Sequence, residues 1–442
     1  MYDDHFVAQF PQDTREAELR QVIRYIRDGS SCQLIGIPGV SRATVLGLLV
    51  YNKHVRQKHL GAFQHESHFI SVDFSEIRNR PLFDVMKYLF LNLTESLRER
   101  GMAEENKAVG DIFREHLKFQ DELVLFQGFK EAVDYLALEK KLTIVFLFNR
   151  FEEYVPNVSK EFFTNLRILR SRAKYRFSIV FSVNRPLEDM LTPEIMSEYY
   201  EFIAGKSVYL TLSDTSSNTF WHTHIEKITG EKVPKNIFET VLQLTGGHGK
   251  LTKLSLEAFL AQDNKQNVTE SFLLTQKTIL GALREIWQSL LPAEQADLKE
   301  SSFTDVEITS YLEGVGLIQQ NKIQIPLLTT YIHSESPQII NVAKKIVYNQ
   351  NTDTIQKGDI ILSDQLTSAE FRLLRYLLQH EERITEREDL IDVVWEGNKS
   401  TAGITDQAVD QLIFRVRHKI EEDANHPTHL ITVKGRGFKF SS

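Results

Sequence analysis

Four short runs of almost uninterrupted apolar residues place the strongest constraint on the fold of this chain. They read HFISVDF, LTIVFLF, FSIVFSV and VYLTL, at residues 68–74, 142–148, 177–183 and 208–212. Helical patterns lie between them, at residues 82–98, 126–138 and 159–172. A strand that is apolar along its whole length is buried on both faces, which is typical of parallel sheets covered by helices. We therefore expect an α/β domain built on a parallel sheet.

A fifth apolar stretch, residues 33–37, leads into a loop rich in glycine and proline, and a helical pattern follows. This order of strand, loop and helix can place backbone N–H groups around a phosphate. The candidate nucleotide-binding residues are Gly36, Gly39, Ser41, Arg42 and Thr44. ATP or ADP is the cofactor that such a loop would hold. A strand–turn–helix without any ligand is the alternative.

The loop departs from the phosphate-binding pattern GxxxxGK[ST] at three positions. Ser41 stands at the second glycine, Arg42 at the lysine and Ala43 at the hydroxyl. Thr44 comes one residue late. A planar guanidinium does not substitute for the lysine ammonium, and a magnesium ion loses a ligand when the hydroxyl is missing.

The acidic positions of a nucleotide hydrolase are changed as well. The apolar run at residues 142–148 is followed by Asn149 and Arg150, and acidic residues come only later, at Glu152 and Glu153. An amide and a cation support metal-assisted hydrolysis poorly. We therefore expect neither catalytic residues nor a bound metal in this part of the chain.

Four segments together resemble the signature points of the STAND and origin-recognition branch of the AAA+ ATPases. They are residues 36–46, 142–154 and 177–186, and the turn TGGHGK at residues 245–250. The resemblance implies a P-loop NTPase-like core at residues 1–212 and a helical lid at residues 213–272. Gly249 replaces the proline that follows the Gly-Gly-His turn in that family. Because the metal-handling positions are changed, the core is expected to be a pseudo-ATPase.

Two winged helices and a linker are expected after the lid. Helical patterns precede the segment EGVGLI and a short hairpin, IQQNKIQIP. They resemble the winged helix that follows the lid in STAND-type proteins, here residues 273–332. This hairpin carries a single lysine, Lys322, so packing between domains is favoured over DNA binding. A polar linker at residues 333–344 leads to the second winged helix, residues 345–442.

The last domain combines a cationic helix with a basic hairpin. Thr367 and Glu370 have the spacing of a capping box at the start of a helix. An apolar stripe lies on one side of the helix at residues 405–420: Val409, Ile413, Val416 and Ile420. The predicted DNA-binding residues lie on the rest of that helix and on the hairpin: Gln407, Gln411, Arg415, Arg417, Lys419, Lys434 and Arg436. Glutamine can bond adenine, and arginine can bond guanine or phosphate.

This domain resembles the effector winged helix of the OmpR/PhoB response regulators. The matching segments are LTSAEFRLLRYLL, EDLIDVVW, AVDQLIFRVRHKI and ITVKGRGFKF, in the order and spacing of the family. The resemblance implies contacts to duplex DNA from the helix and wing residues just named, Gln407 excepted. Phe414 and His418 depart from the family, in which these positions are usually polar or basic.

The charge of the chain limits the functions that it can have. The chain has a net charge of −8, and residues 357–439 carry 12 Lys and Arg against 15 Asp and Glu. DNA binding must therefore come from a local basic surface. We expect a DNA-binding transcriptional regulator, and the resemblance implies a dimer that touches RNA polymerase. The alternatives are an active STAND-type ATP-dependent switch and a winged-helix scaffold in a defence or recombination complex.

The sequence also predicts a cytoplasmic protein without a membrane partner, and the OmpR/PhoB resemblance implies a bacterial one. The single cysteine, Cys32, excludes an internal disulfide and suits a reducing cytosol. The longest apolar runs are too short to cross a bilayer. The first residues, MYDDHFVAQF, lack the cationic and apolar regions of a secretory signal.

Overall fold

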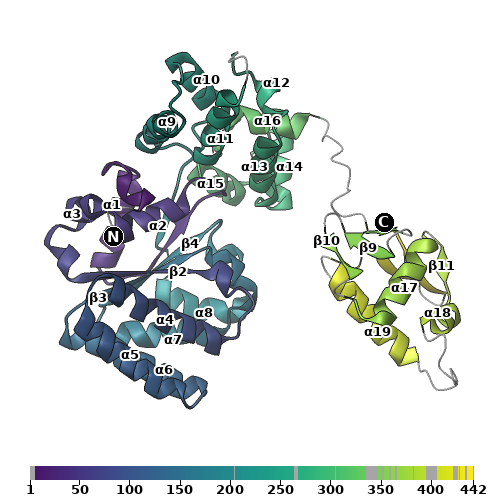
Figure 1. Ribbon diagram of the computed structural model, residues 1–442, viewed down its shortest axis with the longest axis horizontal. Helices are drawn as coiled ribbons and strands as arrows, with labels where there is room; N and C mark the ends of the chain where they lie inside the picture. The colour runs from purple at the N-terminus through teal and green to yellow at the C-terminus, as the bar shows by residue number, and fades with distance from the viewer. Residues whose placement is uncertain are drawn as a thin grey trace. The chain divides into compact units, whose positions relative to one another are not determined.

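The chain forms two compact units in the computed structural model, Met1–His333 and Ser334–Ser442, and each is described by itself (Figure 1). The structure describes residues 5–203, 205–262, 267–303, 305–334, 346–349, 353–357, 360–363, 366–381, 383–394, 406–421, 427, 429–433 and 436–441. The division of the first unit at residues 212 and 272 stays a prediction. Among the described residues, no helix is both long and apolar enough to cross a membrane.

The first unit is built on a parallel sheet of five strands in the order β2-β3-β4-β1-β5. The strands are β1 (Cys32–Ile35), β2 (Ser67–Asp73), β3 (Thr143–Asn149), β4 (Phe177–Val183) and β5 (Ser207–Tyr209). Every residue of β1 and β4 is buried, as expected for strands covered on both faces. The predicted parallel α/β fold is confirmed.

Helices cover both faces of this sheet (Figure 1). One face carries α1 (Glu16–Arg27), α2 (Arg42–Tyr51) and α3 (Lys53–Leu60). The other face carries α4 (Leu82–Glu99), α5 (Ala103–Leu117), α6 (Glu122–Asp134), α7 (Lys160–Arg172) and α8 (Pro193–Ile203). A buried stripe on α1, made of Leu19, Val22, Ile23 and Ile26, shows why such segments pack on the sheet.

In the described residues after β5, the first unit is helical apart from one short hairpin. Its helices are α9 (Thr215–Thr229), α10 (Lys235–Thr245), α11 (Gly249–Leu260), α12 (Glu270–Leu273), α13 (Lys277–Gln288), α14 (Pro292–Glu300), α15 (Val306–Gly314) and α16 (Pro326–His333). The hairpin pairs β6 (Ile318–Gln319) with β7 (Lys322–Ile323), as the sequence predicts. One hydrophobic core runs from the sheet through these helices, so the sheet and the helices that follow it pack together.

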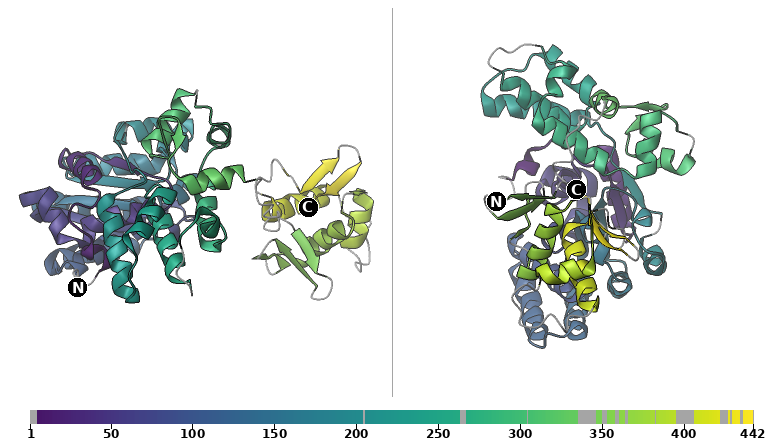
Figure 2. Two further views of the ribbon diagram at one scale, coloured as in Figure 1. Left: turned by 90° about the horizontal axis from the view of Figure 1, so that it is seen from above. Right: turned by 90° about the vertical axis from the view of Figure 1, so that its right-hand side faces the viewer.

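The described residues of the second unit form two antiparallel sheets around three helices. The first sheet contains β8 (Ile346–Asn349), β9 (Thr354–Lys357) and β10 (Ile360–Ile361). The helices are α17 (Ser368–Gln379), α18 (Arg387–Val394) and α19 (Asp406–Ile420). The second sheet contains β11 (Ile384–Thr385), β12 (Leu430–Val433) and β13 (Gly437–Phe440), and β12 and β13 form the wing (Figure 2). The fold is a winged helix.

Local signals explain how the second unit is assembled. Thr367 and Glu370 form the predicted capping box of α17, in which the Thr367 N–H donates to Glu370 Oε2 (2.8 Å). Residues of α17, α19 and the wing close a separate core that includes Leu373, Ile413 and Phe438. The predicted apolar stripe of α19 is buried in this core, so the opposite side of the helix faces outward.

Candidate nucleic-acid interface and phosphate loop

The outward side of α19 carries a mixed stripe at helical spacing. Gln411, Phe414, Arg415 and His418 are exposed there. The side chain of Arg415 is 57% exposed, and its Nε lies 3.5 Å from Glu370 Oε1. An amide, a ring, a guanidinium and an imidazole on one face of a helix can make both hydrogen bonds and apolar contacts to base edges.

Two other predicted DNA contacts are bonded within the second unit. Arg417 donates from Nε and Nη2 to Leu430 O (2.9 and 2.7 Å) and from Nη2 to Thr432 Oγ1 (2.8 Å). Lys419 Nζ donates to Glu370 Oε2 (2.6 Å). These bonds tie α19 to β12 and to the start of α17. Both side chains therefore hold the helix in position, and their contacts to DNA stay predictions.

Burial and hydrogen bonding shift the pKa values of Arg417 and Glu370. Burial lowers the pKa of Arg417, because the charged guanidinium is partly removed from water. Burial also disfavours the ionised form of Glu370, but hydrogen bonds from Lys419 and Thr367 hold the pKa of Glu370 below its usual value. Glu370 is thus a buried anion that joins a helix cap to α19.

The wing brings one predicted cation to the surface. Arg436 is exposed, and its N–H donates to Val433 O (2.9 Å). Gly437 follows with φ of 123°, and a Cβ there would lie 2.1 Å from Thr385 O. Glycine is therefore required for β13 to approach β11. Lys434 and the side chain of Gln407 lie outside the described residues.

The predicted phosphate loop links β1 to α2. Ser41 ends the loop with φ of 68°, and its side chain makes no cap bond to α2. A Cβ on Gly36 would lie 2.7 Å from Val40 Cγ2, so the loop packs tightly on itself. The structure thus confirms the strand–loop–helix geometry, and nucleotide binding by these residues stays a prediction.

The Gly-Gly-His turn of the lid is bonded to this loop. His248 Nε2–H donates to Pro38 O (2.9 Å), and the Lys250 N–H donates to Gly39 O (3.1 Å). A Cβ on Gly39 would lie 2.5 Å from His248 Cε1. Burial lowers the pKa of His248 to about 4, so the imidazole is neutral at physiological pH. His248 also caps α11 by accepting from the Leu251 N–H (3.3 Å).

The cation that replaces the P-loop lysine is paired within the core. Arg42 Nη2 lies 2.6 Å from Glu152 Oε1, and the two side chains are 13% and 16% exposed. At the end of β3, Arg150 donates from Nε and Nη2 to Asp73 (3.0 and 2.6 Å), and Asn149 Nδ2 donates to Asp73 Oδ2 (3.2 Å). Carboxylates of the chain therefore neutralise the positive groups at both positions where a hydrolase would handle phosphate and metal.

The end of β4 is joined to α14 and α15. Arg185 Nη2 lies 2.5 Å from Glu294 Oε1 of α14, and these side chains are only 7% and 2% exposed. The guanidinium also lies 4.9 Å from the ring centroid of Tyr311 in α15, whose hydroxyl donates to Asn184 O (2.9 Å). Burial raises the pKa of Glu294, and the bonds from Leu291 and Arg185 oppose this shift. These contacts attach α14 and α15 to the sheet.

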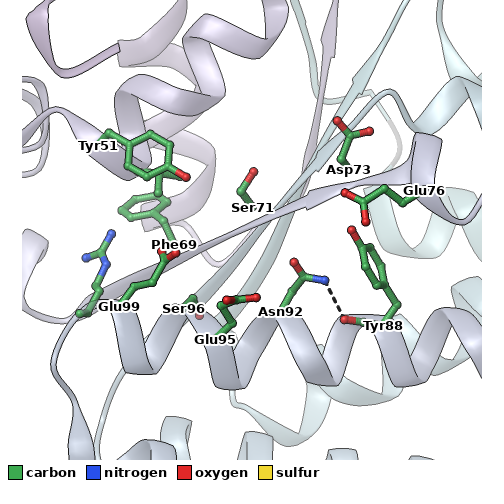
Figure 3. Close-up of a pocket in the computed structure, with 12 residues that line it drawn as sticks. Tyr51, Phe69, Ser71, Asp73, Glu76, Tyr88, Asn92, Glu95, Ser96 and Glu99 are labelled. Carbon is green, nitrogen blue, oxygen red and sulfur yellow. Dashed lines mark hydrogen bonds between the residues drawn. The ribbon is translucent and has the colours of Figure 1, made fainter. Parts of the chain in front are cut away.

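A separate cavity of about 220 Å³ lies between β2 and α4 (Figure 3). Its lining carries four carboxylates, and Arg100 is the one basic residue in that lining. The carboxylates are Asp73, Glu76, Glu95 and Glu99. The loop at residues 36–44 contributes nothing to its wall. This excess of negative charge repels a polyphosphate, so the cavity is no alternative nucleotide site. Among the described residues, no group of three or more His, Cys, Asp or Glu side chains could hold a metal ion.

A known protein family matches part of the second unit. The family model described as "Transcriptional regulatory protein, C terminal" matches residues 364–440. The sensory transduction protein RegX3 of Mycolicibacterium smegmatis is 44% identical over 70 residues, which are 16% of this chain and 29% of that protein. The chain therefore spans less than a third of the length of this curated relative.

Two solved structures resemble different parts of the chain. The RstA DNA-binding domain of Klebsiella pneumoniae, solved in complex with the RstA box, is 25% identical and covers 22% of this chain and 90% of its own, with a TM-score of 0.19. A Walker-type ATPase of Pyrococcus abyssi is 16% identical and covers 75% of this chain and 99% of its own, with a TM-score of 0.47. The sheet, loop and helices described above give the core a P-loop NTPase-like fold, and residues 364–440 form a transcriptional-regulator C-terminal domain of the OmpR/PhoB type.

Proposed function

We propose that this chain is a DNA-binding transcriptional regulator and that α19 enters the major groove of its operator. The observation that carries the proposal is the exposed stripe of α19, within a domain that matches a transcriptional-regulator family. Gln411 can bond adenine through its amide, and Arg415 can bond guanine through its guanidinium. A helix that is apolar inside and polar outside suits such a contact, because an α-helix fits the major groove.

The remaining predicted residues divide into phosphate contacts, positioning residues and one further base contact. Arg436 on the wing, together with Lys434, contacts the phosphate backbone in this proposal. Arg417 and Lys419 fix the direction of α19 through their bonds to β12 and Glu370. Gln407 would be a further base contact near the start of the helix. Two copies on a repeated site, in contact with RNA polymerase, would complete the regulator.

We further infer that the core is a pseudo-ATPase that controls the DNA-binding domain without hydrolysing nucleotide. Three observations support this proposal. Arg42 pairs with Glu152, and Arg150 pairs with Asp73. His248 of the lid donates a hydrogen bond to a carbonyl of the loop. ATP or ADP would enter the loop only after Glu152 releases Arg42. A ligand or protein that separates lid from loop would then be the signal.

Selection of duplexes by the intact chain tests the proposal. The full chain is incubated with a random duplex library at low salt, and the retained duplexes are sequenced over several rounds. A shared motif, bound at least about 10³-fold more tightly than unrelated duplex, is expected for a specific regulator. Retention without any shared motif, or no retention at all, would contradict the proposed function.

A further inference from the structure

Phe414 lies in the middle of the exposed stripe of α19, and the proposed function gives it no individual role. The residue is 53% exposed. Within the described part of the second unit, Val347 on β8 is the other large apolar residue with comparable exposure, at 50%. On the outer face of α19, the ring stays exposed to water unless a ligand covers it, and burying its apolar surface would be favourable.

The surroundings of Phe414 indicate which ligand that is. Gln411 lies one turn before Phe414 and Arg415 directly after it in α19, and both of these polar residues are exposed. The ring of His418 meets it edge to face, with centroids 4.3 Å apart and an interplanar angle of 76°. A single ring among polar groups is too small to be a protein-docking patch. The Phe414 ring and its polar neighbours would fit a ligand whose surface is mostly polar and carries an isolated apolar group.

We propose that Phe414 contacts the C5-methyl group of a thymine in the major groove and so determines specificity at one base pair. Thymine is the base that displays a methyl group there, and an apolar side chain distinguishes it from cytosine. The proposal rests on the proposed function, because α19 must first lie in the major groove. It also predicts that 5-methylcytosine, which carries the same methyl group, is accepted at that position.

The expected effect follows from the burial of one methyl group. Removing one such group from water contributes about 0.8 kcal/mol, which corresponds to about fourfold in affinity. Replacing the critical thymine by deoxyuridine leaves every hydrogen-bonding group of the base pair unchanged. A fourfold loss on this substitution therefore reports the methyl contact and no other.

The experiment is a double-mutant cycle between the protein and the duplex. The probe is the duplex selected by the intact chain, prepared with each thymine replaced in turn by deoxyuridine. Wild-type chain is expected to bind one of these duplexes about fourfold more weakly. The Phe414→Ala chain is expected to bind that duplex and the parent equally. Val347→Ala, which shortens the other exposed apolar side chain, should keep the fourfold difference.

The outcomes separate this inference from the function on which it rests. A selected motif in which no deoxyuridine substitution weakens binding would overturn the inference and leave the proposed function intact. The same holds if the fourfold loss persists in Phe414→Ala. Failure of the full chain to select any motif would overturn both. If Phe414→Ala instead abolished self-association and left discrimination unchanged, the ring would be a contact between copies of the chain.

Discussion

The guanidinium of Arg42 lies 2.6 Å from the carboxylate of Glu152, a residue 110 positions further along the chain. Arg42 opens α2, at the position where a phosphate-binding loop carries its lysine. Glu152 lies three residues beyond the end of β3, whose last residue is Asn149. The cation at the lysine position is therefore bonded to a carboxylate of the chain itself.

This pair predicts how the core responds to nucleotide. ATP with magnesium should leave the Tm of the wild-type chain unchanged, because phosphate must compete with a partly buried carboxylate. In Glu152→Gln the guanidinium loses its charged partner, so ATP should raise the Tm of that variant. Thermal unfolding with and without ATP checks both. Glu153→Gln is the matched control, since that carboxylate lies 4.0 Å from Arg150 instead. Bound ADP in the purified wild-type protein would contradict the prediction.

Arg415 and Arg417 should differ in what their removal changes. Arg415→Ala removes a proposed base contact from an exposed position, so affinity for the selected duplex should fall by about 1–3 kcal/mol with little change in unfolding. Arg417→Ala leaves Leu430 O and Thr432 without their donor and should destabilise the second unit by about 1–3 kcal/mol. Titration of duplex and denaturant unfolding of both variants separate these effects. Equal unfolding free energies in Arg417→Ala and wild type would refute the positioning role.

His248 should make the first unit sensitive to acid. Its pKa is about 4 in the folded chain and 6.5 as the ordinary value, so the unfolded state binds the proton more tightly. The free energy of unfolding should therefore be unaffected by His248 above pH 6.5 and fall as the pH drops from 6.5 towards 4. The loss is about 1.4 kcal/mol per pH unit. Urea unfolding at several pH values should show a smaller slope in His248→Gln, whereas His65→Gln, at an exposed position, should match wild type.

The buried pair of Arg185 and Glu294 should stabilise the contact between the sheet and the first winged helix. Glu294→Ala removes the closer of the two carboxylates that pair with the buried Arg185 and leaves only Asp189, 3.6 Å away, so it should cost up to about 3–5 kcal/mol. Hydrogen exchange in α14 and α15 should accelerate in this variant. Glu239→Ala removes an exposed pair with Lys235 and should cost less than about 1 kcal/mol. Similar exchange in both variants would show that Glu294 does not hold the winged helix in place.

The sequence correctly predicted those helices and strands whose signals lie within a short stretch of the chain. The apolar run at residues 177–183 coincides with β4, and the capping box at Thr367 opens α17. The Gly-Gly-His turn directly precedes α11. Helix α5 (Ala103–Leu117) went unrecognised, because its buried residues are only Val109, Gly110 and Phe113. So sparse a stripe gives a weak periodic signal.

The contacts that the sequence did not predict join residues that lie far apart along the chain. A helical wheel places Lys419 on the outward face with Arg415, and Arg417 at its flank, but it contains no information on Leu430 or Glu370. The carboxylate that Arg42 would meet could not be chosen among the many acidic residues of the chain. The position of His248 against the loop likewise depends on how the lid packs, which no local pattern specifies.

Genome-wide recovery of DNA bound by the full chain tests the central claim most directly. Wild-type chain, Arg415→Ala with Arg436→Ala, and an Arg98→Ala control at an exposed site of the first unit are compared under the same conditions. The account predicts a set of discrete sites with a shared motif for wild type and the control, and their loss in the double variant. Identical sites in all three proteins would show that α19 and the wing do not bind the operator, and would contradict the account.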